Sequence, residues 1–487
     1  MKIHNYFLAV ALIFPFCLFS QSKNLTLDEA ISIAQKKSPE YKISLNRNQR
    51  DYWRFRRYKA SFLPELSLNA TPVYNNEIIR NTNDEGQDEF VNQNQLLLSG
   101  GLSISQSIPY TGGTLSVNSN LERVERFGLN GNVIYSVIPF TLSYRQNSLL
   151  FNPFKWDKRI EPLVYEESKR EFIESMERIS VNTSRRYFEL LKAQKQLEIA
   201  QINLSNQDTL YQIAQGRFKM GKIAENDLLQ MELTLLNSQN SVTTNEIALK
   251  RTSQNLARYL EMENENIALS VPEDLPLFDV EIDKAIAEAQ KNRKAVLEFR
   301  RRRLQAEREV AFQKGNNRLN LGVFANFGKS NNGDNFDDLF SNLNEQQNIR
   351  VSIGIPIFDW GVSKSRIKMA QADLDLTNNN INQDMQEFEQ EIFLHVLNWS
   401  NQRDFLVTAE KAKEVAQKRY DISKKRYILG KITITDLNIA LQEKDSAVFL
   451  YLNSLQKFWQ DYYILRQLTL FDFINDEKIE VEDILYD

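Results

Sequence analysis

The sequence has 487 residues, of which 42% are hydrophobic, and a formal net charge of −4 at pH 7. So small a net charge leaves no broad basic field and argues against a nucleic-acid-binding protein. The single cysteine, Cys17, excludes an internal disulfide framework and a thiolate metal site.

Residues 1–20 have the pattern of a secretory signal peptide. Lys2 supplies a positive charge, residues 7–19 form an apolar run, and Ser20 offers a small residue for cleavage. The run is too short to span a bilayer as a helix. Cys17 raises the alternative of a lipoprotein, but bulky Phe16 precedes it where a lipidation box needs a small residue, so cleavage without lipidation is favoured.

The mature chain opens with a helix and continues with strands. Thr26 and Glu29 form a capping box before a predicted helix that runs to about Lys59 and ends before Pro64. Residues 65–70 then alternate polar and apolar side chains, which fits a barrel wall between lipid and a wet lumen. No later stretch offers the roughly 20 apolar residues of a transmembrane helix, so membrane insertion would require a β-barrel.

The strand region of the first half contains an extra predicted hairpin. Alternation in residues 102–109 runs into a Gly-Gly turn at residues 112–113 and resumes near residues 115–117 and 142–146. Two polar stretches rich in Asn and Asp are expected to form exposed loops: residues 81–95 and residues 331–347.

Aromatic residues lie between the strands and each long helix. They are Phe151, Phe154 and Trp156 in the first half, and Phe358 and Trp360 in the second. Amphipathic rings are enriched at the boundary between hydrocarbon and headgroups, so we expect these five to mark the membrane interface. Ordinary packing at a strand–helix joint is the alternative.

Heptad spacing dominates the long helices. The positions are Leu190, Leu197, Leu204 and Tyr211; Leu228, Leu235, Val242, Leu249 and Leu256; Ile367, Leu374, Ile381 and Phe388; and Leu441, Val448, Leu455 and Tyr462. Such spacing over four or more repeats indicates coiled-coil packing. The polar remaining faces are typical of helices that line a watery tunnel or stand in solvent.

The two halves of the mature chain are copies of one another. Residues 30–36 recur as residues 285–291, and about eight of about eighteen positions are identical between residues 211–228 and 420–437. We divide the chain into a signal peptide (1–20), a first structural repeat (21–260), a second structural repeat (261–470) and an acidic C-terminal tail (471–487).

In this order, the features resemble the TolC-like outer-membrane efflux family over nearly the whole mature length. The signal peptide, Leu-Thr-Leu-Asp-Glu-Ala at residues 25–30, Pro-Ile-Phe-Asp at residues 356–359 and a doubled Arg-aromatic-x-x-Gly element followed by Asp-Leu carry the resemblance. It implies an α+β membrane protein, a homotrimer whose strands share one outer-membrane β-barrel continued by a long α-helical coiled-coil barrel into the periplasm.

The resemblance also implies a function and partners. The chain would be the exit duct of a tripartite efflux or type I secretion system and would conduct cargo passively. Its partners would be a periplasmic adaptor (membrane fusion protein) and an inner-membrane efflux pump or secretion ATPase. The family's four strands per subunit would give a trimer of about twelve strands, whereas the extra hairpin allows about eighteen, and both numbers remain open.

The resemblance places adaptor docking at the Gly element of each repeat. Gly221 and Gly430 lie between two heptad helices, so they are expected to reverse the chain with positive φ at a hairpin tip. Asp227 and Asp436 suit the positive ends of the outgoing helices. The predicted docking residues are Arg217, Phe218, Gly221, Lys222, Asp227 and Leu228 with Arg426, Tyr427, Gly430, Lys431, Asp436 and Leu437.

We expect the repeated arginine, aromatic and lysine residues at this tip to be exposed and to bind a partner's helical hairpin. The alternative is that the element only makes a stable turn. Some family members also narrow the aperture with a ring of paired acidic residues about two turns before the second Gly. Asp421 matches one such position and Lys424 occupies the other, so a ring of mixed charge is expected.

Nothing in the sequence indicates an enzyme, a metal site or a cofactor. His395 falls in the heptad register that contains Phe388, so a seam residue is favoured over a catalytic base. A structural or adhesive coiled-coil protein of the envelope, without a channel, is the competing hypothesis. It shares the heptads and the signal peptide, but it does not explain why strands and helices are duplicated together.

Overall fold

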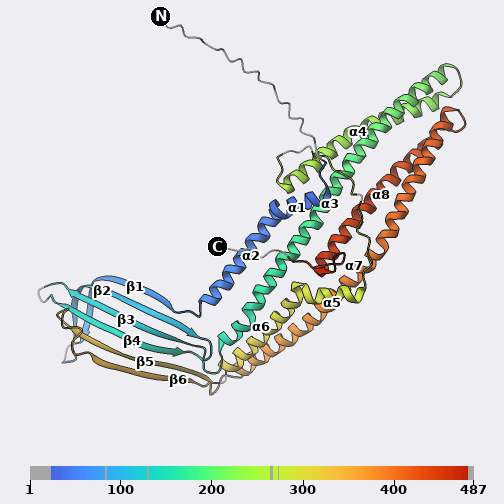
Figure 1. The fold of residues 1–487 in the computed structure, drawn as a ribbon. Coiled ribbons are helices and arrows are strands. Elements are labelled where there is room, and N and C mark those ends of the chain that lie inside the picture. The colour runs from blue at the N-terminus through green and yellow to red at the C-terminus, as the bar shows by residue number, and fades with distance from the viewer. Residues whose placement is uncertain are drawn as a thin grey trace, which may run out of the picture. The chain divides into compact units, whose positions relative to one another are not determined.

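The structure is a computed structural model that describes residues 24–82, 85–128, 131–263, 267–272, 274–317 and 319–480. The predicted signal peptide, Cys17 and the end of the acidic tail lie outside these residues. The chain divides into two compact units, and each draws on both sequence repeats (Figure 1). Unit 1 comprises residues 1–41, 178–278 and 399–464, and unit 2 comprises residues 42–177, 279–398 and 465–487.

Corresponding helices of the two repeats have matching lengths. The helices are α1 Leu27–Lys37, α2 Pro39–Ala60, α3 Pro153–Lys219, α4 Glu225–Leu260, α5 Ile282–Asn292, α6 Lys294–Asn316, α7 Val362–Ile428 and α8 Ile434–Thr469. Both α3 and α7 have 67 residues, and both α4 and α8 have 36. These lengths agree with the predicted duplication and with the long heptad helices.

The first predicted helix is interrupted, which corrects the expectation of one helix to about Lys59. The capping box of Thr26 and Glu29 is present, but α1 ends at Lys37 and α2 starts at Pro39. Ser38 has extended backbone (φ −56°, ψ 153°), because a following proline disfavours helical geometry. The second repeat breaks at the equivalent Arg293, where no proline follows.

Six antiparallel strands form one sheet in unit 2, in chain order β1 to β6. They are β1 Glu65–Thr82, β2 Asp88–Ile108, β3 Gly113–Arg126, β4 Val133–Gln146, β5 Asn320–Gly333 and β6 Asn344–Gly354. The first repeat supplies four strands and the second supplies two, so the extra hairpin is confirmed.

The first polar stretch predicted as a loop, residues 81–95, is largely strand, and the prediction is wrong for it, whereas residues 334–343 of the second stretch do form the connection between β5 and β6. Pairing between β1 and β2 continues from Glu65–Ser105 to Thr82–Asp88, and β5 pairs with β6 as far as Ser330–Asn344. An antiparallel ladder satisfies the hydrogen bonds of the backbone whatever the side chains are. Asn and Gln therefore do not end a strand when neither of its faces packs against an apolar core.

Unit 1 contains two helical hairpins, α3 with α4 and α7 with α8 (Figure 1). Aromatic residues pack together in this unit: the ring centroid of Trp399 lies 5.0 Å from that of Phe458, and the Trp399 Nε1–H donates to the Phe278 carbonyl at 3.2 Å. None of the described helices is long and apolar enough to cross a membrane.

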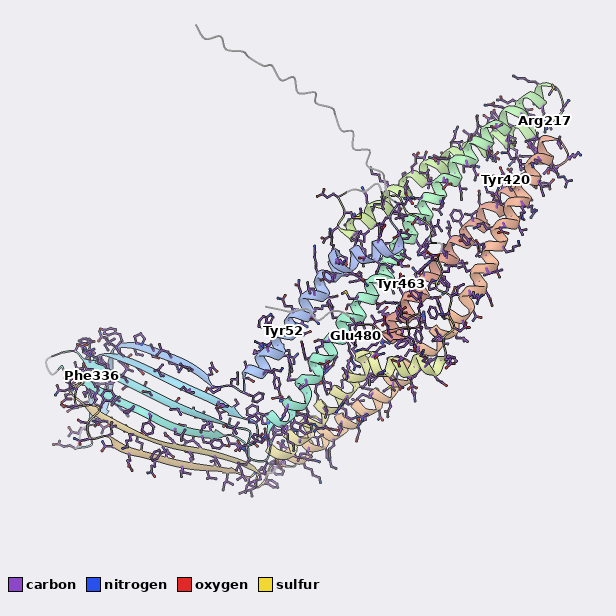
Figure 2. The ribbon with its side chains drawn as sticks, in the orientation of Figure 1. Tyr52, Arg217, Phe336, Tyr420, Tyr463 and Glu480 are labelled. Atoms are coloured by element: carbon purple, nitrogen blue, oxygen red, sulfur yellow. The ribbon has the colours of Figure 1, made fainter. Side chains whose placement is uncertain are left out.

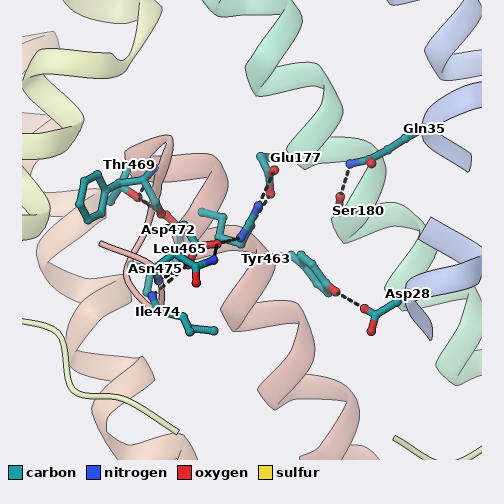
Figure 3. Close-up of polar contacts among 12 residues, drawn as sticks. Asp28, Gln35, Glu177, Ser180, Tyr463, Leu465, Thr469, Asp472, Ile474 and Asn475 are labelled. Atoms are coloured by element: carbon teal, nitrogen blue, oxygen red, sulfur yellow. Dashed lines mark hydrogen bonds and ion pairs between the residues drawn. The ribbon is translucent and has the colours of Figure 1, made fainter. Parts of the chain in front are cut away.

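The described part of the acidic tail is ordered in unit 2. Strands β7 Phe471–Asp472 and β8 Glu477–Lys478 pair as a small hairpin. Arg466, near the end of α8, joins this hairpin to α3 because its guanidinium contacts both Asp472 and Glu177 (Figure 3).

Candidate functional site

The sheet of unit 2 has one face with an exposed apolar row. Strand register places Leu66, Ile104, Val117, Leu142 and Phe327 side by side across β1 to β5. Directly paired residues point to the same face, and all five side chains are between 40% and 68% exposed. Such a contiguous apolar surface marks contact with lipid or with another protein.

The neighbouring register row points to the opposite face and is polar. It consists of Ser67, Ser103, Asn118, Thr141, Gly328 and Gln346. The Ser103 hydroxyl donates to Asn118 Oδ1 at 2.6 Å. The alternation predicted from sequence therefore produces a sheet with one lipid-compatible and one water-compatible face.

The predicted interface aromatics occupy two different environments. Phe151 is buried and packs edge to face on Phe312 with ring centroids 5.2 Å apart, as the alternative of ordinary packing at the strand–helix joint describes. Phe358 and Trp360 are 71% and 87% exposed, with ring centroids 4.5 Å apart. Phe154 and Trp156 are half-buried.

The two Gly turns have the same backbone geometry. Gly221 and Gly430 adopt φ of +69° and +70°. The Gly221 N–H donates to the carbonyl of Phe218 at 2.8 Å, and the Gly430 N–H donates to that of Tyr427 at 2.9 Å. These bonds satisfy carbonyls that the end of a helix leaves without an internal partner, so both turns are helix C-caps as predicted.

A shared apolar cluster joins the two hairpins just behind the turns. Its buried members are Leu210, Ala214, Met231, Tyr420, Tyr427, Ile434 and Leu437. Tyr211, Ile223, Leu228, Ile432 and Leu441 pack against it. The cluster draws on α3, α4, α7 and α8, so the two turns form one packed end of unit 1.

The tip residues of the two repeats are not equivalent in the fold. Arg217 lies near the end of α3 (Figure 2). It caps α7 by donating to the carbonyls of Tyr427 at 3.3 Å and Ile428 at 2.6 Å, and its guanidinium lies 5.5 Å from the centre of the Tyr427 ring. Tyr427 is buried, which corrects the expectation that it is exposed, and burial raises the pKa of its hydroxyl. Its counterpart Phe218 is 39% exposed.

The remaining predicted tip residues divide between packing and surface. Leu437 is fully buried and Leu228 is half-buried, so both contribute to the cluster. Lys222, Arg426 and Lys431 are exposed, as predicted. The turn therefore presents cations and one aromatic ring to its surroundings, while its aliphatic residues hold the hairpins together.

The outgoing helices begin differently. The Thr433 N–H and hydroxyl both donate to Asp436 Oδ2, at 3.1 and 2.8 Å, and the Asp436 N–H donates to the Thr433 hydroxyl at 3.2 Å. This capping box starts α8, and its spacing was readable in the sequence. In the first repeat Ala224 occupies the N-cap and makes no side-chain cap, so Asp227 can act only through the helix dipole.

We expect Thr433→Ala to destabilise the α7/α8 tip by about 1 kcal/mol, because it removes the N-cap hydroxyl. Hydrogen bonds from Thr433, together with the charge of Arg426, lower the pKa of Asp436. The stabilisation from Asp436 is therefore present above its unfolded-state pKa and is lost as pH falls through the lower folded-state pKa. Amide hydrogen exchange in the first turn of α8, measured across that pH range, tests both effects.

Ala224→Thr provides the matched control, because it would create the same box with Asp227 at the start of α4. It should slow exchange in α4 by a similar factor. Equal exchange in all variants would contradict the capping argument.

The predicted aperture pair is split between two environments. Asp421 is exposed and accepts a hydrogen bond from Gln417 at 3.1 Å. Lys424 is half-buried, and its Nζ donates to Asn206 Oδ1 of α3 at 2.6 Å. Within one chain Lys424 thus helps to join the hairpins, a role that the heptad pattern did not reveal.

Comparison with known proteins identifies the architecture. Residues 285–469 match the family model of the outer membrane efflux proteins. No curated protein matches the sequence significantly. Three solved structures share the fold at 15% sequence identity. They are the CmeC outer membrane channel of Campylobacter jejuni (TM-score 0.66, 91% of this chain and 85% of that chain), the outer-membrane channel OprN (0.65, 91% and 89%) and the outer membrane protein VceC of Vibrio cholerae (0.59, 93% and 97%).

The two-faced sheet and the paired helical hairpins thus have the fold of an outer-membrane channel. The family match covers the second repeat, and together with the shared fold it confirms the resemblance to the TolC-like outer-membrane efflux family. The matched family is described as outer membrane efflux proteins, and CmeC and OprN are described as outer membrane channels.

Proposed function

We propose that three copies of this chain form the exit duct of a tripartite efflux or type I secretion system. The observation that carries the proposal is the sheet, which exposes an apolar row on one face and a polar row on the other. In a closed barrel the apolar row would meet lipid and the polar row would line a water-filled lumen.

The strand count supports a barrel of about eighteen strands rather than about twelve. Each subunit contributes six strands, and within the described residues β1 and β6 each pair on one side only. An unpaired strand edge is unsatisfied in lipid, so β1 of one subunit would pair with β6 of the next until the wall closes. Exposed Phe358 and Trp360 would then lie at the membrane interface.

The packed end of unit 1 is the proposed docking site for a periplasmic adaptor. Exposed Phe218, Lys222, Arg426 and Lys431 supply one apolar ring and three cations at the turns. An aromatic ring among flexible cations suits a partner's helical hairpin with acidic flanks. Asp421 is exposed on α7 and would contribute to an aperture ring. The positive charge of Lys424 would partly compensate the negative charge of that ring.

We also propose that the duct is passive and that energy comes from an inner-membrane pump or secretion ATPase. Among the described residues no group of three His, Cys, Asp or Glu side chains could hold a metal ion. His395 is half-buried on α7 and fits a structural position in the helix seam. A passive duct predicts that the purified protein shows no saturable nucleotide hydrolysis.

Membrane fractionation tests the proposal against a channel-free envelope protein. We expect the protein in the outer-membrane fraction, extracted only by detergent, and running as a heat-modifiable trimer on gels. The physical reason is that the apolar row of the sheet requires lipid and the strand edges require partner subunits. Release by salt alone, or a monomer in detergent, would favour the structural or adhesive alternative.

A further inference from the structure

The polar face of the sheet carries two arginines near its helix end. Arg145 of β4 pairs with Phe324 of β5, and Phe324 pairs in turn with Arg350 of β6. Each of the three lies four residues along its strand from a member of the polar row described above, so all three point to the polar face. Arg145 is the penultimate residue of β4, and Arg350 lies four residues before the end of β6. Both cations therefore lie where the strands lead toward α3 and α7.

Both guanidinium groups are exposed, and neither forms an ion pair with a carboxylate in the described part of the chain. The Arg145 guanidinium lies 5.4 Å from the centre of the half-buried Phe324 ring. A cation–π contact attracts the guanidinium to the ring but supplies no acceptor oxygen. Arg145 is therefore held beside the sheet while its N–H donors remain available to a ligand.

The sign of the charge changes along the polar face. The register row next to the arginines holds one carboxylate, Glu65, followed by Ser105, Ser116, Ser143, Asn326 and Asn348. Toward the opposite strand ends, the described residues of this face carry Glu77, Glu89 and Glu122 with a single arginine, Arg126. Charges that serve only solubility are usually interspersed. A basic end separated from an acidic end indicates a further role for the two arginines.

Arg145 also borders a cavity of about 1010 Å³ where the strands meet α6. Its lining includes the hydroxyl and amide side chains of Thr114, Asn147, Ser148, Asn316 and Asn320. Two other charged residues line it, and both are engaged: Arg308 pairs with Asp157 at 3.0 Å, and Glu309 accepts a hydrogen bond from Gln313 at 2.6 Å. Within the described residues, Arg145 is thus the charged group of this lining that is left for a ligand.

We propose that this end of the polar face binds soluble polyvalent anions, such as cargo that carries phosphate or carboxylate groups. The proposal rests on the trimeric duct proposed above, in which the polar face lines the lumen. Three subunits would bring Arg145 and Arg350 together as six guanidinium groups at the helix end of the lumen. The planar guanidinium forms paired hydrogen bonds with phosphate and carboxylate oxygens, and neighbouring amides and hydroxyls can donate to the remaining oxygens. Anionic solutes would therefore concentrate where the tunnel opens into the barrel.

Anion binding to the purified trimer tests the proposal. The probe is inositol hexakisphosphate, titrated by calorimetry at low ionic strength, where charges are weakly screened. The double variant Arg145→Gln with Arg350→Gln should bind the probe about tenfold more weakly, because each substitution removes a charge-assisted contact. Lys329→Gln is the matched control, since Lys329 lies two residues from Phe327 on the apolar face of β5 and its loss should leave the affinity unchanged.

A second readout measures the channel itself. In planar bilayers under a potassium chloride gradient, the reversal potential of the double variant should shift toward cation preference, because the lumen loses up to six positive charges. Lys329→Gln should leave the reversal potential where it is in the unmodified protein.

The outcomes separate this site from the duct. Conducting trimers that do not bind the probe, or bind it equally well after the double substitution, would overturn the anion site and leave the duct intact. Weaker binding in Lys222→Gln with Lys431→Gln, but not in the arginine variant, would place the probe at the exposed turns and also overturn the site. An unmodified protein that forms no trimers and no conducting channels would overturn both proposals.

Discussion

Replacing both Gly221 and Gly430 with valine is expected to abolish export while trimers still assemble in the outer membrane. Both glycines have φ near +70°, and no atom lies within 4 Å of a Cβ placed on either. The cost of valine is therefore backbone strain, about 1–3 kcal/mol at each turn, rather than a clash. A β-branched residue would reshape both turns and misplace the exposed residues proposed to bind the adaptor.

Gly216→Ala is the matched control for this variant. Gly216 lies in α3 without a positive φ, and a Cβ there also meets nothing within 4 Å. Alanine should be tolerated or slightly stabilising, because it favours helix. Export of a fluorescent substrate and crosslinking to the adaptor are measured together. Unchanged export and crosslinking in the valine variant would place the docking surface elsewhere.

Arg466→Ala is expected to destabilise unit 2 by about 3–5 kcal/mol, the usual effect of breaking a buried ion pair. The guanidinium donates to both carboxylate oxygens of Glu177, at 3.0 and 3.2 Å, and to Asp472 at 2.7 Å. The Glu177 side chain is only 4% exposed, so the variant leaves a buried carboxylate without its cation (Figure 3). Urea unfolding followed by circular dichroism measures the loss, and limited proteolysis reports release of the tail.

Two controls assign the effect to the unpaired charge. The double variant Arg466→Met with Glu177→Gln should recover much of the stability, because it removes both charges together. Lys411→Ala removes an exposed pair with Glu414 and should change nothing measurable. A small effect of Arg466→Ala would indicate that water reaches Glu177 and that the tail hairpin is held by other contacts.

Local patterns predicted most of the fold. Period-two alternation found the strands, heptads found the four long helices, and Gly221 and Gly430 marked the turns, because each of these depends on neighbouring residues alone. The helix break at Arg293 was not predicted, because it is accompanied by a contact with a distant part of the chain that local sequence does not show. Glu174 of α3 accepts the Lys294 N–H at 3.0 Å and so caps α6 from another helix.

The exposure of the tip residues could not be predicted for a related reason. Phe218 and Tyr427 occupy the same position of two sequence copies, and nothing local says which copy turns its ring inward. That choice depends on which flank of each hairpin meets the other. The contact between the two hairpins therefore determines which ring is buried. Heptad spacing cannot show this, because it describes the packing face of one helix at a time.

The unequal starts of α4 and α8 bear on the symmetry of an assembled ring. Three chains would bring six turns to one rim. The turns are alike in backbone, but they differ in chemistry: Thr433 caps the helix after each α7/α8 turn, whereas Ala224 provides no side-chain cap after each α3/α4 turn. The rim then has threefold rather than sixfold rotational symmetry. A partner that binds every turn would meet two classes of site in alternation, with two affinities and a stoichiometry that changes with its concentration.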